Sequence, residues 1–276
     1  MSLVTAKEIL VPARREGRAI GAFNIANFET GVAVVEAAEA EKSPVIIQVY
    51  QRLMGGRHID ALAAMMLQLA KGSSAPIAIH LDHGAALEQV ELALKLGFTS
   101  VMFDGSTMPY EENVRLTKPA VAMAAKSGAS VEAEIGHVPL SGEADIPLPT
   151  VEEVCKFAES TGVDSLAVAV GTVHGYYKGE PKIDLEFGRK AGEALSIPMV
   201  LHGGSGTPHD TVRKLIKSGF AKVNVATEFQ HCFQLSMEKE MNSQNGKFMP
   251  FDKLAMRPTD EATQLLRSFI RLFRQP

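Results

Sequence analysis

Three histidines of this chain stand where an apolar run ends, and each is followed by glycine. They are His83, His174 and His202, and they are widely separated along the chain. Imidazole is a common zinc ligand, and a catalytic zinc is held by three protein ligands with a fourth position open. Each histidine alone is more often a packed or capping residue. Three at strand ends together predict a metal site assembled from distant segments.

Two short segments have the composition of phosphate-binding loops. Gly203-Gly204-Ser205-Gly206 directly follows His202 and is too rich in glycine to serve packing. Backbone N–H groups of such a loop can cradle an anion. Asn224-Val225-Ala226-Thr227 ends another apolar run just before a predicted helix, whose N-terminus also favours anions. Both segments are candidates for binding a sugar phosphate.

The elements that must position these residues alternate regularly. Short apolar runs predict strands at residues 19–25, 44–50, 77–83, 100–104, 130–135, 165–171, 198–203 and 221–226. Amphipathic stretches predict helices at residues 29–42, 59–71, 88–96, 110–126, 151–160, 185–195, 210–217 and 228–240. A polar connector at 240–254 precedes a last basic amphipathic helix at about 259–273. Eight strands alternating with eight helices predict an α/β fold, a (β/α)8 TIM barrel with an extra C-terminal helix.

An open, doubly wound sheet is the alternative architecture. It would have a glycine-rich turn after its first strand, whereas the first run here ends Phe23-Asn24-Ile25-Ala26-Asn27, without G-x-G-x-x-G. The barrel is therefore favoured, and residues 1–276 are expected to form one domain.

Composition and charge exclude several classes of partner. The 276 residues are 46% hydrophobic and 22% charged, which suits a large core, and the net charge is −4. That charge gives no electrostatic reason to expect nucleic acid or a membrane surface as partner. The N-terminus lacks the apolar block of a signal peptide, so a cytoplasmic location is expected. The last helix is expected to pack on the barrel or on a neighbouring subunit of a homodimer or homotetramer.

Carboxylates are expected around the same mouth, where the carboxyl ends of barrel strands converge. Asp82 and Asp104 stand at strand ends, and Glu132 and Glu134 alternate along the fifth strand. Period-two spacing directs both glutamates to one side, and the apolar residues between them indicate that this side is the lumen. Buried carboxylates need a cation or an ion pair. Lysines and arginines are scarce in the strands, so a metal-rich mouth is favoured over an internal ion pair.

With these residues in order, the chain resembles the class II, zinc-dependent ketose-bisphosphate aldolases. The likeness covers most of the barrel. The matching segments are Ala22-Phe23-Asn24, Pro44-Val45-Ile46-Ile47-Gln48, His80-Leu81-Asp82-His83-Gly84, Phe103-Asp104-Gly105-Ser106, Glu132-Ala133-Glu134, Gly171-Thr172-Val173-His174-Gly175, Lys178-Gly179-Glu180-Pro181, His202-Gly203-Gly204-Ser205-Gly206 and Asn224-Val225-Ala226-Thr227.

The resemblance implies a role for each matched position. The three histidines would hold a catalytic Zn²⁺, and Asp104 and Glu134 match positions that can hold a second divalent or monovalent cation or a displaced one. Asp82 would be the acid/base on the substrate C4 hydroxyl. The residues implied in binding dihydroxyacetone phosphate and the rest of the substrate are Asn24, Gly175, Lys178, Gly203, Gly204, Ser205, Asn224, Val225, Ala226 and Thr227.

The implied reaction belongs to carbohydrate metabolism, as in glycolysis. A ketose 1,6-bisphosphate of the fructose or tagatose type would be cleaved reversibly to dihydroxyacetone phosphate and glyceraldehyde 3-phosphate, through a zinc-stabilised enediolate with Asn224 as a further donor. An acid on the loop after the fifth strand would carry the C3 proton. This loop is longer than the Gly-Gly-x-Glu-Asp version typical of the family, so Glu143 is the first choice and Asp145 the second.

Other functions stay open at this point. Tyr50 stands where a serine is common and the tail after Met241 diverges, so another phosphorylated keto sugar is an alternative substrate. A non-catalytic sugar-phosphate-binding subunit would not need all three histidines and Asp82. A zinc barrel that epimerises or hydrolyses a sugar derivative does not explain two phosphate loops. A Schiff-base aldolase needs a lumen lysine, and Lys222 is expected at the wrong end of its strand.

Overall fold

The barrel of this protein is closed by eight parallel strands. The computed structural model describes residues 2–143 and 146–274. Strands follow one another in sequence order around the barrel, and β8 closes it by pairing with β1. The strands are β1 (Ile20–Asn24), β2 (Val45–Tyr50), β3 (Ile77–Gly84), β4 (Ser100–Phe103), β5 (Ser130–Ile135), β6 (Ser165–Val168), β7 (Met199–Leu201) and β8 (Phe220–Val225). The predicted TIM barrel is confirmed.

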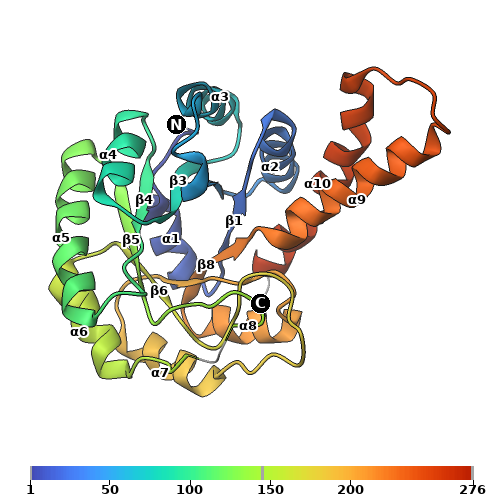
Figure 1. Ribbon diagram of the computed structural model, residues 1–276. Coiled ribbons are helices and arrows are strands. Elements are labelled where there is room, and N and C mark those ends of the chain that lie inside the picture. Colours follow the sequence, from blue (N-terminus) through green and yellow to red (C-terminus); the bar gives the residue numbers. More distant parts are fainter. Residues whose placement is uncertain (1, 144–145, 275–276) are drawn as a thin grey trace.

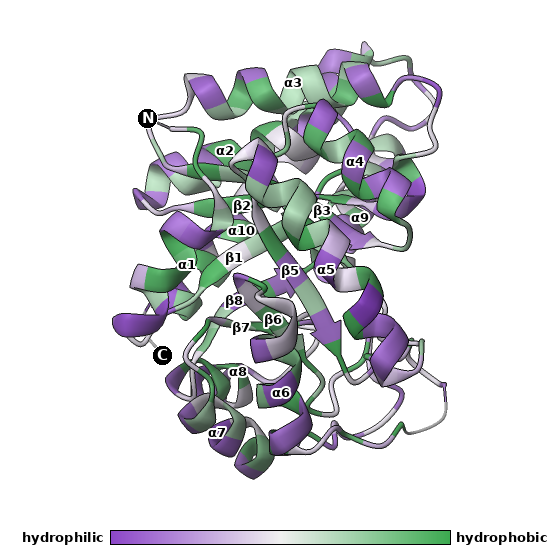
Figure 2. Ribbon diagram, turned by 90° about the vertical axis from the view of Figure 1, so that its left-hand side faces the viewer, coloured by the Kyte–Doolittle hydropathy of each residue, from purple (hydrophilic) through white to green (hydrophobic). Residues whose placement is uncertain are grey.

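Helices surround the barrel (Figure 1). They are α1 (Ala6–Arg15), α2 (Phe28–Glu41), the 3₁₀ turn η1 (Gln51–Leu53), α3 (Ile59–Gly72), α4 (Leu87–Lys95), α5 (Tyr110–Ser127), α6 (Val151–Thr161), α7 (Leu185–Ala194), α8 (His209–Lys217), α9 (Thr227–Ser243) and α10 (Phe251–Arg274). Figure 2 shows hydrophilic and hydrophobic residues interspersed along these outer helices, as expected for helices with one face on the core. In the part of the chain that the structure describes, no helix has the length and apolar character needed to cross a membrane.

Helix α1 was not predicted, and it packs against the barrel strands beneath the site. It begins with a capping box in which Thr5 and Glu8 satisfy each other's backbone N–H groups. Its buried face packs with a small cluster that includes Ile20, Ile46 and Ala78. The Thr-x-x-Glu spacing was the available signal for this helix, and Pro12 inside it masked the periodicity.

The predicted C-terminal boundaries were wrong. Helix α10 begins at Phe251 instead of about residue 259, and α9 runs to Ser243, so most of the expected connector is helical. Pro258 lies inside α10, and this proline misled the prediction. Figure 1 shows α9 and α10 as a paired hairpin that projects from the barrel.

Candidate metal centre and active site

Three histidine side chains meet at the carboxyl ends of the strands, as the sequence predicted. The ring centroids of His83 and His202 are 4.6 Å apart, those of His83 and His174 are 5.0 Å apart, and those of His174 and His202 are 5.8 Å apart. One nitrogen from each ring lies within 4.8 Å of the others. His83 also groups with Asp104 and Glu134 in a second set of possible metal ligands.

His83 is fixed by its strand and by a carboxylate. It lies in β3 with φ of 54°, a left-handed conformation that is uncommon for a residue with a side chain, and the β3–β4 register shifts beside it. Its Nδ1 lies 2.7 Å from Asp104 Oδ2 in a hydrogen bond. Because that bond occupies Nδ1, Nε2 remains to face the other histidines. The ring of Tyr50 packs against it, with centroids 5.6 Å apart.

His202 follows β7 and is almost fully buried between two carboxylates. Its Nε2 lies 3.1 Å from Glu132 Oε1, and its Nδ1 lies 3.0 Å from Glu134 Oε2. Burial alone would lower the pKa of His202, but these two carboxylates raise it to about 10. Burial alone would raise the pKa of Glu132, but the neighbouring Lys222 and His202 lower it.

His174 stands on a loop instead of a strand. Strand β6 ends at Val168, earlier than predicted, and the chain then forms an isolated bridge between His174 and Leu140. His174 N donates to Pro139 O at 2.8 Å, and Ser141 N donates to His174 O at 2.9 Å. Burial, followed by the neighbouring His83, lowers the pKa of His174 to about 3. Its ring is therefore neutral and offers a lone pair.

This donor set fits a divalent cation. His202 Nδ1 and Glu134 Oε2 are both fully buried and lie 3.0 Å apart, but neither makes a hydrogen bond of acceptable geometry with any of the described residues. Unsatisfied buried polar atoms are costly unless something else binds them. Three imidazoles with nearby carboxylates match the ligands and number of a catalytic zinc site with an open position.

Asp82 lies beside this cluster and is held by amides. Its Oδ2 accepts a hydrogen bond from Asn24 Nδ2 at 2.7 Å, and its Oδ1 accepts a longer one, of 3.4 Å, from Asn224 Nδ2. Gln48 in turn donates to Asn24 Oδ1 at 2.9 Å, which fixes the amide's orientation. Burial would raise the pKa of Asp82, but His83 and His202 hold it below its usual value. The carboxylate is therefore ionised and can accept a proton.

Most predicted substrate residues line one narrow cleft next to the histidines. Its lining residues are Asn24, Tyr50, Asp82, His83, His174, Gly175, Gly203, Ser205, Asn224, Ala226 and Thr227. Gly203 has φ of 70°, and a Cβ there would come within 2.4 Å of Val173 O, so only glycine fits this turn. Gly204 uses its N–H on Asn224 O at 3.0 Å, which ties the loop after β7 to β8.

The remaining predicted residues lie outside this cleft. Val225 is buried in β8. Lys178 is exposed, with its amine against Gly142 on the loop after β5. Glu143 is also exposed, and its carboxylate accepts a hydrogen bond from Leu140 N at 2.7 Å, within its own turn. Asp145 lies outside the described residues.

The expectation that Glu132 has no lysine partner was wrong. Lys222 is fully buried, and its Nζ donates to Glu132 Oε2 at 2.8 Å. The side chain therefore points into the lumen, from the first half of β8, where the sequence placed it. Lys222 and Asn224 are two residues apart on β8, and this period-two spacing was the signal that could have placed both on the lumen face.

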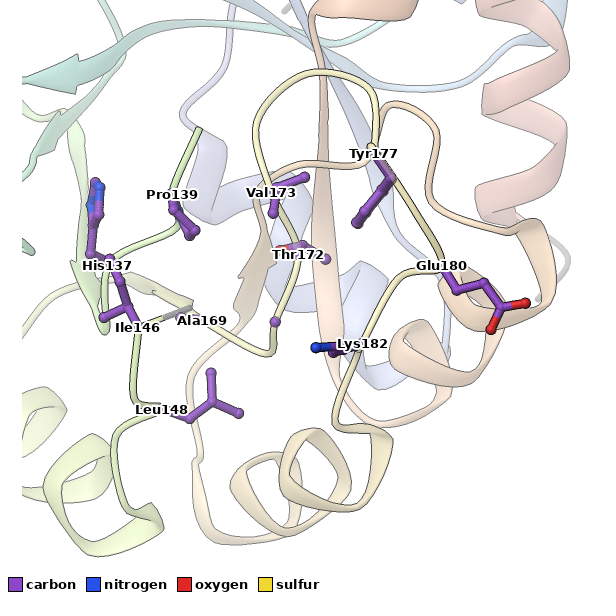
Figure 3. A pocket seen from close by; sticks show the side chains of 11 residues that line it. His137, Pro139, Ile146, Leu148, Ala169, Thr172, Val173, Tyr177, Glu180 and Lys182 are labelled. Atoms are coloured by element: carbon purple, nitrogen blue, oxygen red, sulfur yellow. The ribbon is translucent and has the colours of Figure 1, made fainter. Parts of the chain in front are cut away.

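A second cavity lies beside the mouth, between the loops that follow β5 and β6 (Figure 3). It has a volume of about 310 Å³ and is lined by His137, Pro139, Ile146, Leu148, Ala169, Gly171, Thr172, Val173, Tyr177, Glu180 and Lys182. None of the three clustered histidines lines it, and it shares no lining residue with the cleft beside them.

Comparison with known proteins identifies the class. Residues 4–275 match the family model described as fructose-bisphosphate aldolase class-II. The chain belongs to this family, and it is accordingly an aldolase, a carbon–carbon lyase of carbohydrate metabolism.

Individual relatives agree with this assignment. The fructose-bisphosphate aldolase of Staphylococcus aureus is 40% identical over 259 residues, which cover 91% of this chain and 90% of that protein. That of Geobacillus stearothermophilus is 43% identical over 84% of each chain. Among solved structures, the YdjI aldolase from Escherichia coli K12 superposes with a TM-score of 0.89 at 32% identity, over 99% of this chain and 98% of that one.

Proposed function

We propose that this protein is a zinc-dependent aldolase that reversibly cleaves a ketose 1,6-bisphosphate, of the fructose or tagatose type, to dihydroxyacetone phosphate and glyceraldehyde 3-phosphate. The observation that carries the proposal is the convergence of His83, His174 and His202 beside an ionised Asp82. His83 Nε2 and Asp82 Oδ1 are 3.9 Å apart, so a substrate bound at the histidines would present its hydroxyls to this carboxylate.

The three histidines would hold the Zn²⁺, with Asp104 and Glu134 available to a second or displaced cation. A bound zinc would supply Lewis-acid stabilisation of the negative charge that develops on substrate oxygens when the C3–C4 bond breaks.

Asp82 would take the proton of the C4 hydroxyl during cleavage and return it during condensation. Asn24 and Asn224 keep its carboxylate in place through the two hydrogen bonds that they donate. Asn224 would also donate to the oxyanion of the substrate, because an amide aimed at developing charge stabilises the transition state.

The substrate phosphate would bind at the loops after β7 and β8, with Gly203, Ser205 and Thr227 at the cleft surface. In TIM barrels these two loops commonly form the phosphate site. Gly206 N donates to the Glu228 carboxylate at 3.2 Å, and this hydrogen bond from the turn to a negatively charged group supports the placement of the phosphate here. Lys178 would add a positive charge at the mouth.

The C3 proton would be carried by Glu143 on the loop after β5. This side chain is exposed, and Ser141 of the same loop is tied to His174 by a backbone hydrogen bond. Movement of the loop on substrate binding would bring the acid to the cleft, as lids do in other enzymes.

Removal of the metal tests the proposal. Prolonged chelation should abolish triose-phosphate release from fructose and tagatose 1,6-bisphosphates, and Zn²⁺ should restore it. Borohydride added with substrate should leave the enzyme active, because no imine forms. Capture of a lysine adduct, or full activity after verified metal removal, would contradict the proposal.

The second candidate function is the same aldol cleavage of a ketose phosphate with a different aldehyde half, and the position of Tyr50 supports it. Its ring lines the cleft, and the guanidinium of Arg52 lies 4.6 Å from the ring centroid. A bulky aromatic and a cation at this edge would select an aldehyde of different size or charge. Turnover of a panel of ketose 1-phosphates with varied distal groups distinguishes the two candidates.

We also propose that the enzyme is a cytoplasmic homodimer or homotetramer. Apolar side chains gather at the end of the α9–α10 hairpin, where Phe248 is 90% exposed and Phe251 is 65% exposed. Exposed apolar groups of this kind favour a protein interface. Light scattering after size-exclusion chromatography gives the mass of the protein in solution. A monomer at micromolar concentration would contradict the proposed homo-oligomer.

A further inference from the structure

A second polar layer lies buried beneath the histidine cluster, and no step described above uses it. Its members are Lys222 and His80, both fully buried, and Glu132, which is 1% exposed. Lys222 Nζ donates to Glu132 Oε2 at 2.8 Å and lies 3.4 Å from His80 Nε2. Exchange of a buried ion pair for apolar residues is often neutral or stabilising, so stability alone does not account for this pair.

The direction of each hydrogen bond in this layer follows from Lys222. An ammonium group has three donors and no acceptor. Glu132 Oε2 and His80 Nε2 must therefore accept from it. His80 then carries its proton on Nδ1, which lies 2.8 Å from Ser100 Oγ and donates to that hydroxyl. The donor and acceptor of each of these hydrogen bonds are therefore set by the ammonium group of Lys222.

The same reasoning decides which nitrogen of His202, a ligand in the proposed metal site, carries a proton. Lys222 donates to one oxygen of the Glu132 carboxylate, and a carboxylate paired with an ammonium group has acceptors only, so the second oxygen, Oε1, also accepts. This oxygen lies 3.1 Å from His202 Nε2, which must donate its N–H to it. Metal binding releases the proton from the ligating nitrogen of a histidine. With Nε2–H held by Glu132, the proton released from His202 is the one on Nδ1, and Nδ1 then offers its lone pair. That Nδ1 is buried 3.0 Å from Glu134 and makes no hydrogen bond of acceptable geometry with any of the described residues.

We propose that Lys222 and Glu132 are positioning residues that fix the tautomer and ring orientation of His202, so that Nδ1 faces the metal. Carboxylates hydrogen-bonded to the far nitrogen of a ligating histidine commonly set its orientation and basicity. Lys222 holds Glu132 Oε2 and thereby fixes which oxygen of the carboxylate is free for His202. The proposal rests on the metal site of the proposed function.

The test measures zinc affinity directly. In the double variant Lys222→Met/Glu132→Gln neither charge is left unpaired, and a neutral amide replaces the carboxylate. Because that amide can present either its oxygen or its NH₂ to His202, the tautomer is no longer fixed. Competition with a chromophoric chelator should show zinc binding weakened about 10- to 100-fold, the usual cost of losing such a partner. Thermal unfolding of the metal-free protein confirms that the variant is folded.

Ser100→Ala is the matched control. It removes a hydrogen bond from the same buried layer but leaves both contacts of Glu132 intact. We expect a lower melting temperature with a zinc affinity within about threefold of the wild type, a change of well under the 1.4 kcal/mol that a tenfold change represents. If Ser100→Ala weakens zinc binding as much as the double variant does, the layer acts only through packing and the proposal is wrong.

A second measurement uses the wild-type protein and therefore does not depend on the folding of a variant. Nitrogen-15 spectra of the zinc-loaded wild type report which His202 nitrogen carries hydrogen, and we expect Nε2–H with Nδ1 bound to the metal. The opposite tautomer would overturn the proposal, as would wild-type affinity in a folded double variant. If the wild type itself binds no zinc, the proposed function fails first, so the two failures are distinguishable.

Discussion

The strand-borne part of the site and its loop-borne part are held in very different ways. Asp82 in β3 and His202 at the end of β7 are almost fully buried, and each has more than one polar partner from another strand. Glu143 and Lys178 are exposed on loops, and the Glu143 carboxylate is bonded only within its own turn. The barrel thus fixes the groups for which we propose set distances, whereas the loops carry the groups that we propose to admit and enclose substrate. Variants in the two parts should therefore fail differently.

His202→Ala should have the largest effect, because it removes a proposed zinc ligand from the strand-borne part. We expect metal content near zero and activity reduced by more than roughly 10³-fold, since a metal supplies several kcal/mol of transition-state stabilisation. Metal analysis of the purified protein checks this. His58→Ala, at an exposed histidine before α3, is the control and should keep both metal and activity.

Asp82→Ala should separate chemistry from metal binding within the same strand-borne part. Zinc content and fold should persist, while turnover falls by roughly 10²- to 10³-fold, the scale of a general acid/base. Metal analysis and kcat are measured on the same sample. Loss of zinc with unchanged turnover per bound metal would remove Asp82 from its assigned role.

Glu143→Ala should affect only one step, because the residue belongs to the loop-borne part. Exchange of the dihydroxyacetone phosphate C–H proton with solvent should slow by roughly 10²-fold or less. Zinc content and phosphate binding should stay near wild type. Asp145→Ala is the paired variant and should do much less. A larger exchange defect in Asp145→Ala would transfer the role two residues along the loop.

Glu41→Gln should have the smallest effect, because it lies outside both parts. Glu41 accepts hydrogen bonds from Arg271 and Arg267 of α10, and these lower its pKa. Because the pKa of Glu41 is lower in the folded than in the unfolded protein, the contact contributes its full stabilisation at pH values above the pKa of an ordinary glutamate. This stabilisation is lost as the pH falls through the lowered pKa of the folded state. The variant should melt about 1–3 °C lower at pH 7, with a shrinking difference below about pH 4.5 and unchanged zinc affinity.

Sequence periodicity was sufficient for the barrel and for much of the mouth. Alternating apolar runs predicted all eight strands, and position after a strand was enough to group His83, His174 and His202, although His174 lies on the loop after β6. Local signals failed where a proline interrupts a helix, at Pro12 in α1 and Pro258 in α10. Helix propensity is local, but whether a proline is tolerated depends on what the helix packs against.

The sequence by itself placed Glu132 and Glu134 on the lumen face and Asp82, His83 and His202 at the carboxyl ends of their strands. Only the tertiary structure decided which of them touch. Glu132 meets Lys222 across 90 positions of sequence, and Asp82 meets Asn224 across 142. Period-two alternation assigns a side chain to a face, but the stagger of a closed barrel sets the level at which facing side chains meet. That stagger is a property of all eight strands together.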